Sequence, residues 1–488
     1  MSISFDSIPA AVRTPFVFCE FDGSGAVRGP QALSFRALLL GQRTGAGTAA
    51  ANQLVLVTSA AQAKTLFGAG SVLAGMFQAY FAQNSFTEVW AMPVADDGSG
   101  VAAVGSVAFG GTASTAGTVA MMVAGRPVKV AVANGNNATA VATAAAAAVN
   151  AITDLPVTAS ALSDTVTVTA KNKGATGNDI DLRVNYYDGE SMPAGLTANI
   201  TAMTGGATNP SLSAAIAALG DEWFQVIGSA FRDGQSLADL KSEMDSRWGP
   251  IRQIDGHVIA AASGTVGDMT TLGSTLNDKH LSVVATQRSP TPAYEVAAET
   301  AAIVAYYASI DPARPLQTLG YQWMKAPARG NRYTLTERNT LLYSGIATVR
   351  VSTAGAVTVE RLITTYRTNE AGGTDPAYLD LETLMTLQYI RWDWRNYILN
   401  KFPRHKLADD GTRYAPGQVV VTPLTMKAEV IAKFGDWEQL GLVEGFELFK
   451  RDLIVERNAQ DRNRLDVLMP PDLINQLRTM GTKIAWLL

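Results

Sequence analysis

The stretch that decides the fold is WFQVIGSAFRDGQSLADLKSEMDSRW at residues 223–248, followed by HVIAAAS at 257–263 and LSVVAT at 281–286. Its three short, continuous apolar runs are typical of buried strands. A helix is expected between the first two, with Ser236 and Asp239 at the spacing of a capping box. Further helices are expected near 266–277 and 293–308. Strands that alternate with helices predict right-handed crossovers and a largely parallel sheet.

The same rhythm occurs nearer the start of the chain. ALLLG at 37–41, LVLV at 54–57 and TEVWAMPV at 87–94 read as strands, and Ser71 is a suitable N-cap for a helix. A hairpin at 346–366 turns about Thr353-Ala354-Gly355. We therefore expect residues 31–95 and 210–361 to form one α/β core with an open mixed sheet, in a chain that is α/β in class and α+β overall.

Residues 96–209 have a different composition. Positions 101–170 contain only four charged residues and are rich in alanine, glycine, threonine and valine. Short runs with β-strand patterning, such as the alternation in DTVTVTA at 164–170, surround one alanine-rich helix near 137–152. This pattern predicts a β-rich domain inserted into the core and facing outward.

Residues 362–482 read as a C-terminal α+β region. Asp375 as N-cap with Pro376 at the first helical position predicts the start of a long helix. Thr422-Pro423 predicts the next start, and Gly441 its end. FELFKRDLIVERN at 446–458 and RLDVLMP at 464–470 are expected to be two strands around a polar turn, with a last helix-like piece after them.

Both ends of the sequence read as extended arms, over residues 1–30 and 483–488. Their apolar positions are Phe16, Phe18, Phe21, Ile484, Trp486 and Leu488. Extended apolar segments with no core of their own are suited to adding a strand to another chain's sheet. The alternative, that either strand completes its own subunit's sheet, stays open.

Composition excludes some function classes. The 39 basic and 43 acidic residues nearly cancel, so the positive field of a nucleic-acid-binding protein is missing. Cys19 is the one cysteine, which excludes a disulfide within the chain and indicates a reducing compartment. Without a signal peptide or a long apolar run, we expect assembly in a cytoplasm and no membrane insertion.

The sequence contains none of the common catalytic or cofactor-binding motifs. His257, His280 and His405 are isolated in sequence, and no zinc motif, P-loop or nucleophile elbow occurs. Gly45–Ala50 resembles a dinucleotide fingerprint but lacks the following helix, and Gly264–Gly267 reads as a tight turn. The charged run Arg404–Arg413 reads as a surface loop, either free in solvent or in polar contact with a partner. We expect no catalytic residue, metal or cofactor; a cytoplasmic α/β enzyme with an unrecognised active site remains the alternative.

Three long C-terminal segments resemble the tail sheath proteins of Mu-like contractile-tailed bacteriophages: ERLITTYRTNEAGGTDPAYLD, PRHKLADDGTRYAPGQVVVTP and DLIVERNAQDRNRLDVLMPPDLINQLR. The resemblance extends over essentially the whole chain, and FGAGSVLAGMFQAYFAQNSFTEVWAMP at 67–93 is an earlier example. It implies a structural virion protein that polymerises helically by strand exchange around a tail tube. The polymer would be metastable and would contract to drive the tube through a cell envelope. Expected partners are further copies of the chain, the tube protein, and the baseplate and tail terminator proteins.

Overall fold

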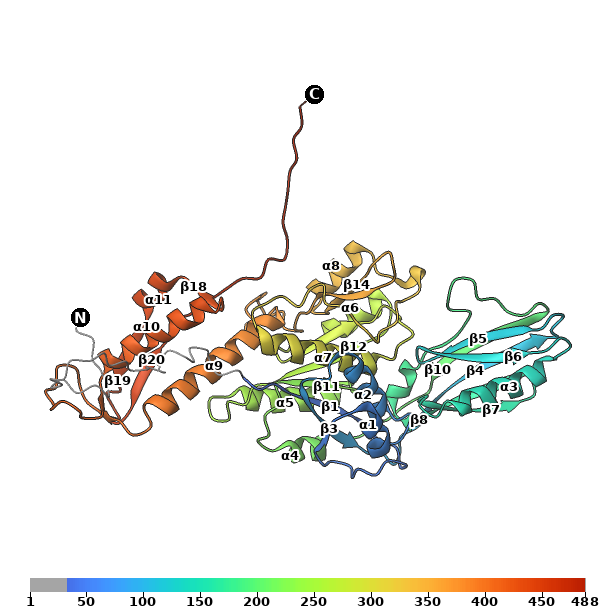
Figure 1. The fold of residues 1–488 in the computed structure, drawn as a ribbon, viewed down its shortest axis with the longest axis horizontal. Coiled ribbons are helices and arrows are strands. Elements are labelled where there is room, and N and C mark those ends of the chain that lie inside the picture. Colours follow the sequence, from blue (N-terminus) through green and yellow to red (C-terminus); the bar gives the residue numbers. More distant parts are fainter. Residues whose placement is uncertain (1–32, 488) are drawn as a thin grey trace, which may run out of the picture.

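The computed structural model describes residues 33–487, and the molecule is elongated (Figure 1). Three parts lie in a row: a domain built from residues near 101–208, a central α/β core, and a C-terminal helical region. Each part has a separate hydrophobic cluster of buried residues. Phe16, Phe18, Phe21 and Leu488 lie outside the described residues.

The central sheet has six strands in the order β13-β12-β11-β1-β3-β2. All neighbouring pairs are parallel except β2 with β3, so the prediction of an open, largely parallel mixed sheet is confirmed. Val226–Ser229 pairs with Arg36–Gln42, which joins the two parts of the core that the inserted domain separates in sequence. The strands are β1 (Arg36–Gln42), β2 (Val55–Val57), β3 (Glu88–Val94), β11 (Val226–Ser229), β12 (His257–Ala262) and β13 (Leu281–Ala285).

Helix α7 (Ala293–Ile310) is buried along almost its whole length, because it contacts β11 and β12 on one side and α2 on the other. Ser71 caps α2 by accepting a hydrogen bond from the Ala74 N–H, as expected. The prediction of a capping box at Ser236 is wrong, because α5 begins at Gly234 and Asp233 is its N-cap. The other core helices are α1 (Ala60–Phe67), α2 (Val72–Gln83), α4 (Ser213–Leu219), α5 (Gly234–Trp248) and α6 (Val266–Ser274).

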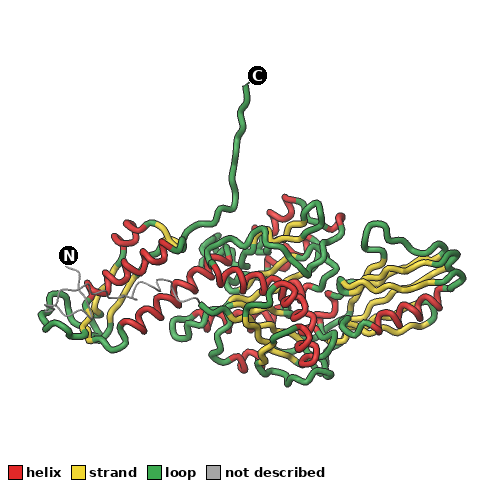
Figure 2. Tube along the Cα trace, in the orientation of Figure 1, coloured by secondary structure: helices red, strands yellow, loops and turns green. Residues whose placement is uncertain are grey.

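The inserted domain consists of two sheets and helix α3 around a core of their own (Figures 1 and 2). Valines of β8 point inward while the threonines between them are more exposed, which is the expected period-2 pattern. Val101 pairs with Ala207, so the segments that enter and leave the domain lie side by side. Its elements are β4 (Ala102–Gly111), β5 (Gly117–Val123), β6 (Arg126–Val132), α3 (Ala138–Ala151), β7 (Val157–Leu162), β8 (Thr165–Lys173), β9 (Leu182–Val184) and β10 (Leu196–Thr204).

A hairpin of β14 (Thr348–Val351) and β15 (Val357–Arg361) follows helix α8 (Leu335–Tyr343). Gly355 in its turn has φ +86°, a left-handed conformation that glycine adopts without strain. Main-chain bonds from Ala347 to Val283 and from Thr318 to Val359 attach the hairpin to β13 and to the segment before α8. The expected hairpin is therefore present, and both of its strands have neighbours.

Helix α9 (Leu381–Lys401) joins the core to the C-terminal region. It begins five positions after the expected Pro376, because Asp375 instead accepts hydrogen bonds from the Tyr366 hydroxyl and the Ala377 N–H in a preceding turn. Leu381 packs in the central core, whereas Ile390 packs in the C-terminal one. One continuous helix thus spans both cores.

The C-terminal region contains α10 (Pro423–Gln439), which starts at Thr422-Pro423 as expected, with Gly441 just past its end. FELFKRD, expected as strand, is helix α11 (Phe446–Asp452), since this conformation buries Phe449 against Phe434. No helix follows Met469 within the described chain, contrary to expectation. The remaining strands are β16 (Lys406–Leu407), β17 (Val420–Val421), β18 (Val443–Glu444), β19 (Ile454–Arg457), β20 (Leu465–Leu468) and β21 (Asp472–Leu473).

Candidate assembly surfaces

The C-terminal tail, residues 479–487, extends away from the body of the molecule as irregular chain (Figures 1 and 2). Every residue of the tail is exposed. Of the arm residues singled out from the sequence, Ile484 is 80% and Trp486 is 78% exposed. Full burial of each such side chain is worth about 1.5–3 kcal/mol, so the tail has a strong tendency to find an apolar partner.

The arm root, residues 472–478, holds the tail to two parts of the molecule. Leu473 pairs with Val443 in the C-terminal region, and the Ile474 N–H donates to the Leu442 carbonyl. At the end of the root, Arg478 contacts Asp380 and Glu382 beside the core, at 3.1 and 2.8 Å. The arm root was not recognised from the sequence, because its partners lie far away along the chain.

The β19–β20 hairpin is the longest strand pair in the C-terminal region. Within residues 33–487, neither strand has a second strand partner. An unpaired edge presents free N–H and C=O groups to any strand that approaches it. Val455 and Val467 pack against α10 and its neighbours, so one face of the hairpin is covered, while its two edges have no strand partner within residues 33–487.

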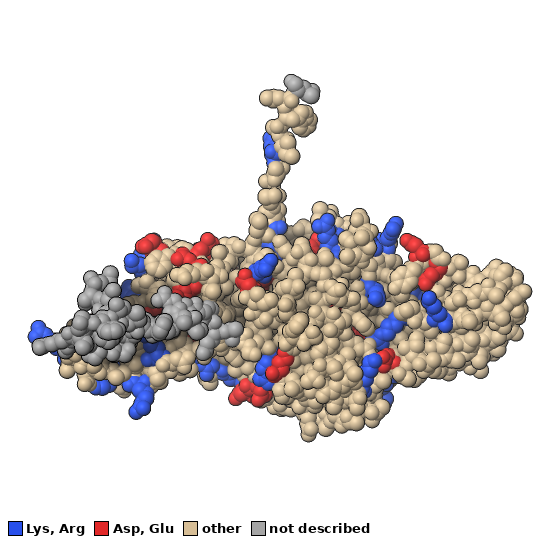
Figure 3. Space-filling model, viewed as in Figure 1, with Lys and Arg blue, Asp and Glu red and all other residues tan. Residues whose placement is uncertain are grey.

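Charged side chains are dense on the C-terminal region and sparse on the far end of the inserted domain, as the face in Figure 3 shows. The loop Arg404–Arg413 is attached to the β19–β20 hairpin by ion pairs. The carboxylate of Asp409 forms ion pairs with the guanidinium groups of Arg457, at 2.9 Å, and Arg462, at 2.8 Å. These two arginines hold the pKa of Asp409 below its usual range.

The inserted domain is fixed to the core by polar contacts. Arg126 lies 3.1 Å from the carboxylate of Glu295, which is 1% exposed. Burial raises the pKa of Glu295, while Arg126 and the Trp323 indole N–H oppose this change. A second ion pair, Arg232 with the 5% exposed Asp179, ties the same two parts.

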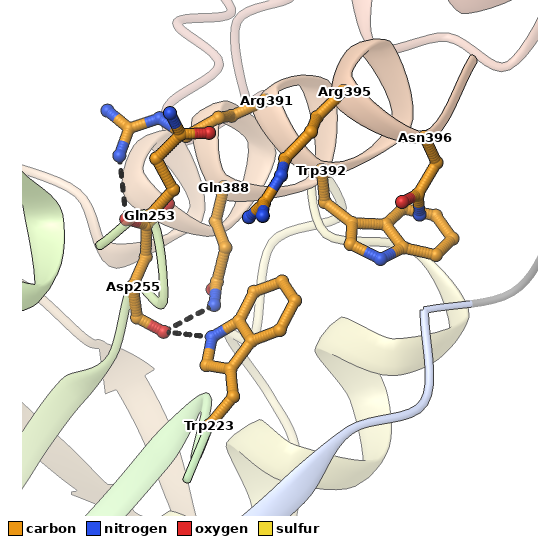
Figure 4. Close-up of a pocket in the computed structure, with 8 residues that line it drawn as sticks. All are labelled: Trp223, Gln253, Asp255, Gln388, Arg391, Trp392, Arg395 and Asn396. Atoms are coloured by element: carbon orange, nitrogen blue, oxygen red, sulfur yellow. Dashed lines mark hydrogen bonds and ion pairs between the residues drawn. The ribbon is translucent and has the colours of Figure 1, made fainter. Parts of the chain in front are cut away.

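A cavity of about 240 Å³ lies where α9 crosses the core (Figure 4). Two tryptophans, Trp223 and Trp392, lie on its walls, and Arg391 extends across to Asp255 at 2.7 Å. Burial raises the pKa of Asp255 to about 6, although Arg391 favours its charged form. The Asp255 carbonyl also accepts hydrogen bonds from Trp223 and Gln388, so these groups fasten the helix to the core.

His257 and His280 lie near each other where β12 and β13 begin, and the Val258 N–H donates to the His280 carbonyl, whereas His405 lies apart from them against Phe402. His257 bonds Ser282 inside the sheet at 2.8 Å, and burial is the main cause of the low pKa of His280, about 3. Gly264–Gly267 forms the expected strand-to-helix turn. Residues 33–487 contain no group of three His, Cys, Asp or Glu placed to hold a metal ion. None of the helices in that range has the length and apolar character of a membrane span.

An exposed apolar tail and strand edges that lack a partner within residues 33–487 are typical of a subunit that joins a larger assembly. The family model for the phage tail sheath protein central domain matches residues 205–365, and that for the phage tail sheath C-terminal domain matches residues 373–484. The chain is 46% identical to the Mu-like prophage FluMu tail sheath protein of Haemophilus influenzae, over 100% of both chains. The chain belongs to the phage tail sheath protein family.

Solved structures of sheath proteins are also similar. A sheath tail protein of Desulfitobacterium hafniense is 12% identical, with a TM-score of 0.48 over 94% of this chain and 100% of that one. The helical sheath of the anti-feeding prophage in its contracted state is 9% identical, with a TM-score of 0.48 over 97% and 99%.

Family membership confirms the resemblance read from the sequence. This chain is a structural component of a phage tail, and the enzyme alternative is set aside because the family and the relative are structural proteins.

Proposed function

We propose that this sheath protein polymerises helically around a tail tube in an extended, metastable form and contracts to drive the tube through the host envelope. The exposed apolar tail is the observation that supports polymerisation most directly. Energy stored at assembly needs no cofactor. A few kcal/mol per subunit, summed over a cooperative array, is enough to drive a rigid-body change.

Strand exchange is the proposed link between copies. A donated strand forms several main-chain hydrogen bonds, each with a net value of about 0.5–1.5 kcal/mol, in addition to burying its apolar side chains. The donors are the arms at 1–30 and 483–488, through Phe16, Phe18, Phe21, Ile484, Trp486 and Leu488. The open edges of the β19–β20 hairpin make it the proposed acceptor.

Further partners and the domain layout belong to the same proposal. Residues 31–95 and 210–361 form the core, residues 96–209 face outward, and residues 362–482 face the tube, where their higher charge supports polar contacts. The baseplate and terminator proteins would close the two ends of the sheath. The subunit would assemble in the host cytoplasm and remain in the virion tail.

Deletion of the arms tests strand exchange. Chains without residues 1–22 or 483–488 should melt cooperatively at nearly the wild-type temperature but form no tubes in negative-stain micrographs. The fold should survive because the described part of residues 483–488 makes no hydrogen bond within residues 33–487. Regular tubes from either truncated chain, or loss of its fold, would contradict the proposal.

A further inference from the structure

The boundary between the arm root and the tail is sharp. Arg478 is 13% exposed, whereas every residue from Thr479 to Leu487 is exposed. Ile474, Gln476, Leu477 and Arg478 each form a hydrogen bond with the body of the molecule, whereas residues 479–487 form none within residues 33–487. The chain is therefore released from the body of the molecule at a single peptide unit.

Arg478 is held by groups from two separate segments. One guanidinium nitrogen donates to Asp380 at 3.1 Å and to Glu382 at 2.8 Å, at the start of α9. Another approaches the Gln317 side-chain oxygen at 3.4 Å, while the Gln317 amide donates to the Leu477 carbonyl at 3.1 Å. Both the main chain and the side chain at the end of the arm root are thereby oriented.

The acidic groups that receive Arg478 are themselves fixed. Glu382 is 2% exposed on its side chain and accepts the Leu316 N–H at 2.9 Å. Asp380 also pairs with Arg361 of β15 at 2.9 Å. Partly buried, charge-assisted bonds to fixed acceptors restrict direction far more than exposed pairs do.

We propose that Arg478 is a clamp that sets the point and direction at which the C-terminal tail leaves the subunit, and so positions the tail for a second copy of the chain. The inference rests on the proposed strand exchange and identifies what prepares the donated strand. A tail that leaves in a fixed direction loses less conformational freedom on binding than one that swings from a loose root.

Four variants test the clamp, with tube formation measured by pelleting and negative-stain microscopy. Arg478→Gln removes the guanidinium group that bonds Asp380 and Glu382. A Gly-Gly-Ser insertion after Thr479 keeps that group but lets the tail leave in any direction. Deletion of residues 479–488 tests strand exchange itself. Arg451→Gln is the matched control, because Arg451 is 70% exposed, lies in α11 outside the hairpin and, among the described residues, pairs only with the adjacent Asp452.

The clamp predicts that Arg478→Gln and the insertion each raise the critical concentration for tubes by about tenfold, in line with the loss of preorganisation, while Arg451→Gln does not. A nitroxide at Met480→Cys, in a Cys19→Ser background, should give a narrower spectrum in the Arg478→Gln monomer than in the otherwise wild-type monomer. A purely stabilising arginine would change the melting temperature without producing the insertion effect.

The outcomes separate the two proposals. Tubes from the deletion variant overturn strand exchange. No tubes from the deletion variant, with wild-type assembly by the insertion variant, overturns the clamp even if Arg478→Gln fails to fold. An unchanged nitroxide spectrum in folded Arg478→Gln also overturns it.

Discussion

At the scale of single residues, a few buried charged side chains attach the inserted domain to the α/β core. Arg126 touches Gln78 of α2 as well as Glu295 of α7, and it lies over the Trp323 ring at 5.6 Å. Glu295 has no other cation within hydrogen-bond reach among the described residues. A buried carboxylate that loses its only cation is costly, so this contact is sensitive to substitution.

Arg126→Ala should lower the free energy of unfolding by about 3 kcal/mol, because it leaves Glu295 buried and unpaired. The double variant Arg126→Met, Glu295→Gln should recover part of that loss, since no isolated charge remains. Urea denaturation measures both. If Arg126→Ala is no worse than the exposed control Arg464→Ala, the ion pair does not stabilise the junction.

A second residue-scale prediction concerns His280. Burial, followed by nearby Lys279, Lys241 and Arg391, lowers its pKa to about 3. Below the unfolded pKa near 6.5 the unfolded chain binds a proton that the folded chain does not. Stability from this group is therefore complete above pH 6.5 and falls towards pH 3, by at most about 1.4 kcal/mol per pH unit.

His280→Gln should reduce that loss, so the stability difference between pH 7 and pH 4.5 becomes smaller than in the wild type. Asp255 and Glu299 oppose the trend, because burial raises their pKa values to about 6 and 7 and their contribution is lost as pH rises. They are present in both proteins and therefore cancel in the comparison. Equal pH dependence of unfolding in the two proteins would refute the assignment to His280.

At the scale of elements, the proposal that the edges of the β19–β20 hairpin accept a donated strand can be tested by removing their N–H groups. The Asn458 N–H donates to the Arg464 carbonyl, so alternation places the N–H groups of Val455 and Val467 on the outer edges of β19 and β20. Proline at these two positions removes only outward-facing donors.

The doubly substituted chain Val455→Pro, Val467→Pro should keep its fold but form no tubes, because neither edge can accept a full set of main-chain bonds. Val455→Ala, Val467→Ala is the control, since it removes similar packing and keeps both N–H groups. Circular dichroism and electron microscopy give the two readouts. Normal tubes from the proline variant would exclude the hairpin as acceptor.

At the scale of the molecule, the inserted domain has its own core and enters and leaves the α/β core through paired segments. A short Gly/Ser linker in place of residues 96–209, combined with Glu295→Gln, should therefore give a folded chain that still forms tubes. Melting curves and micrographs check this expectation. A folded chain without tubes would place the inserted domain in the assembly interface.

Local pattern was sufficient for much of this architecture. Alternating strands and helices predicted the mixed sheet, and Ser71 and Thr422 predicted two helix starts, because capping and burial periodicity depend on neighbours in sequence. The charge-poor insertion was equally visible in composition. The long similar segments identified the family.

Long-range contacts decided the rest. FELFKRD is helical because Phe449 stacks on Phe434 of α10. Asp375 lies in a turn and not at a helix start, because its carboxylate accepts a hydrogen bond from the Tyr366 hydroxyl. The clamp at Arg478 depends on acids 98 and 96 positions earlier in the chain. Such sites follow from which segments the packed core brings together, and a local pattern contains no record of that proximity.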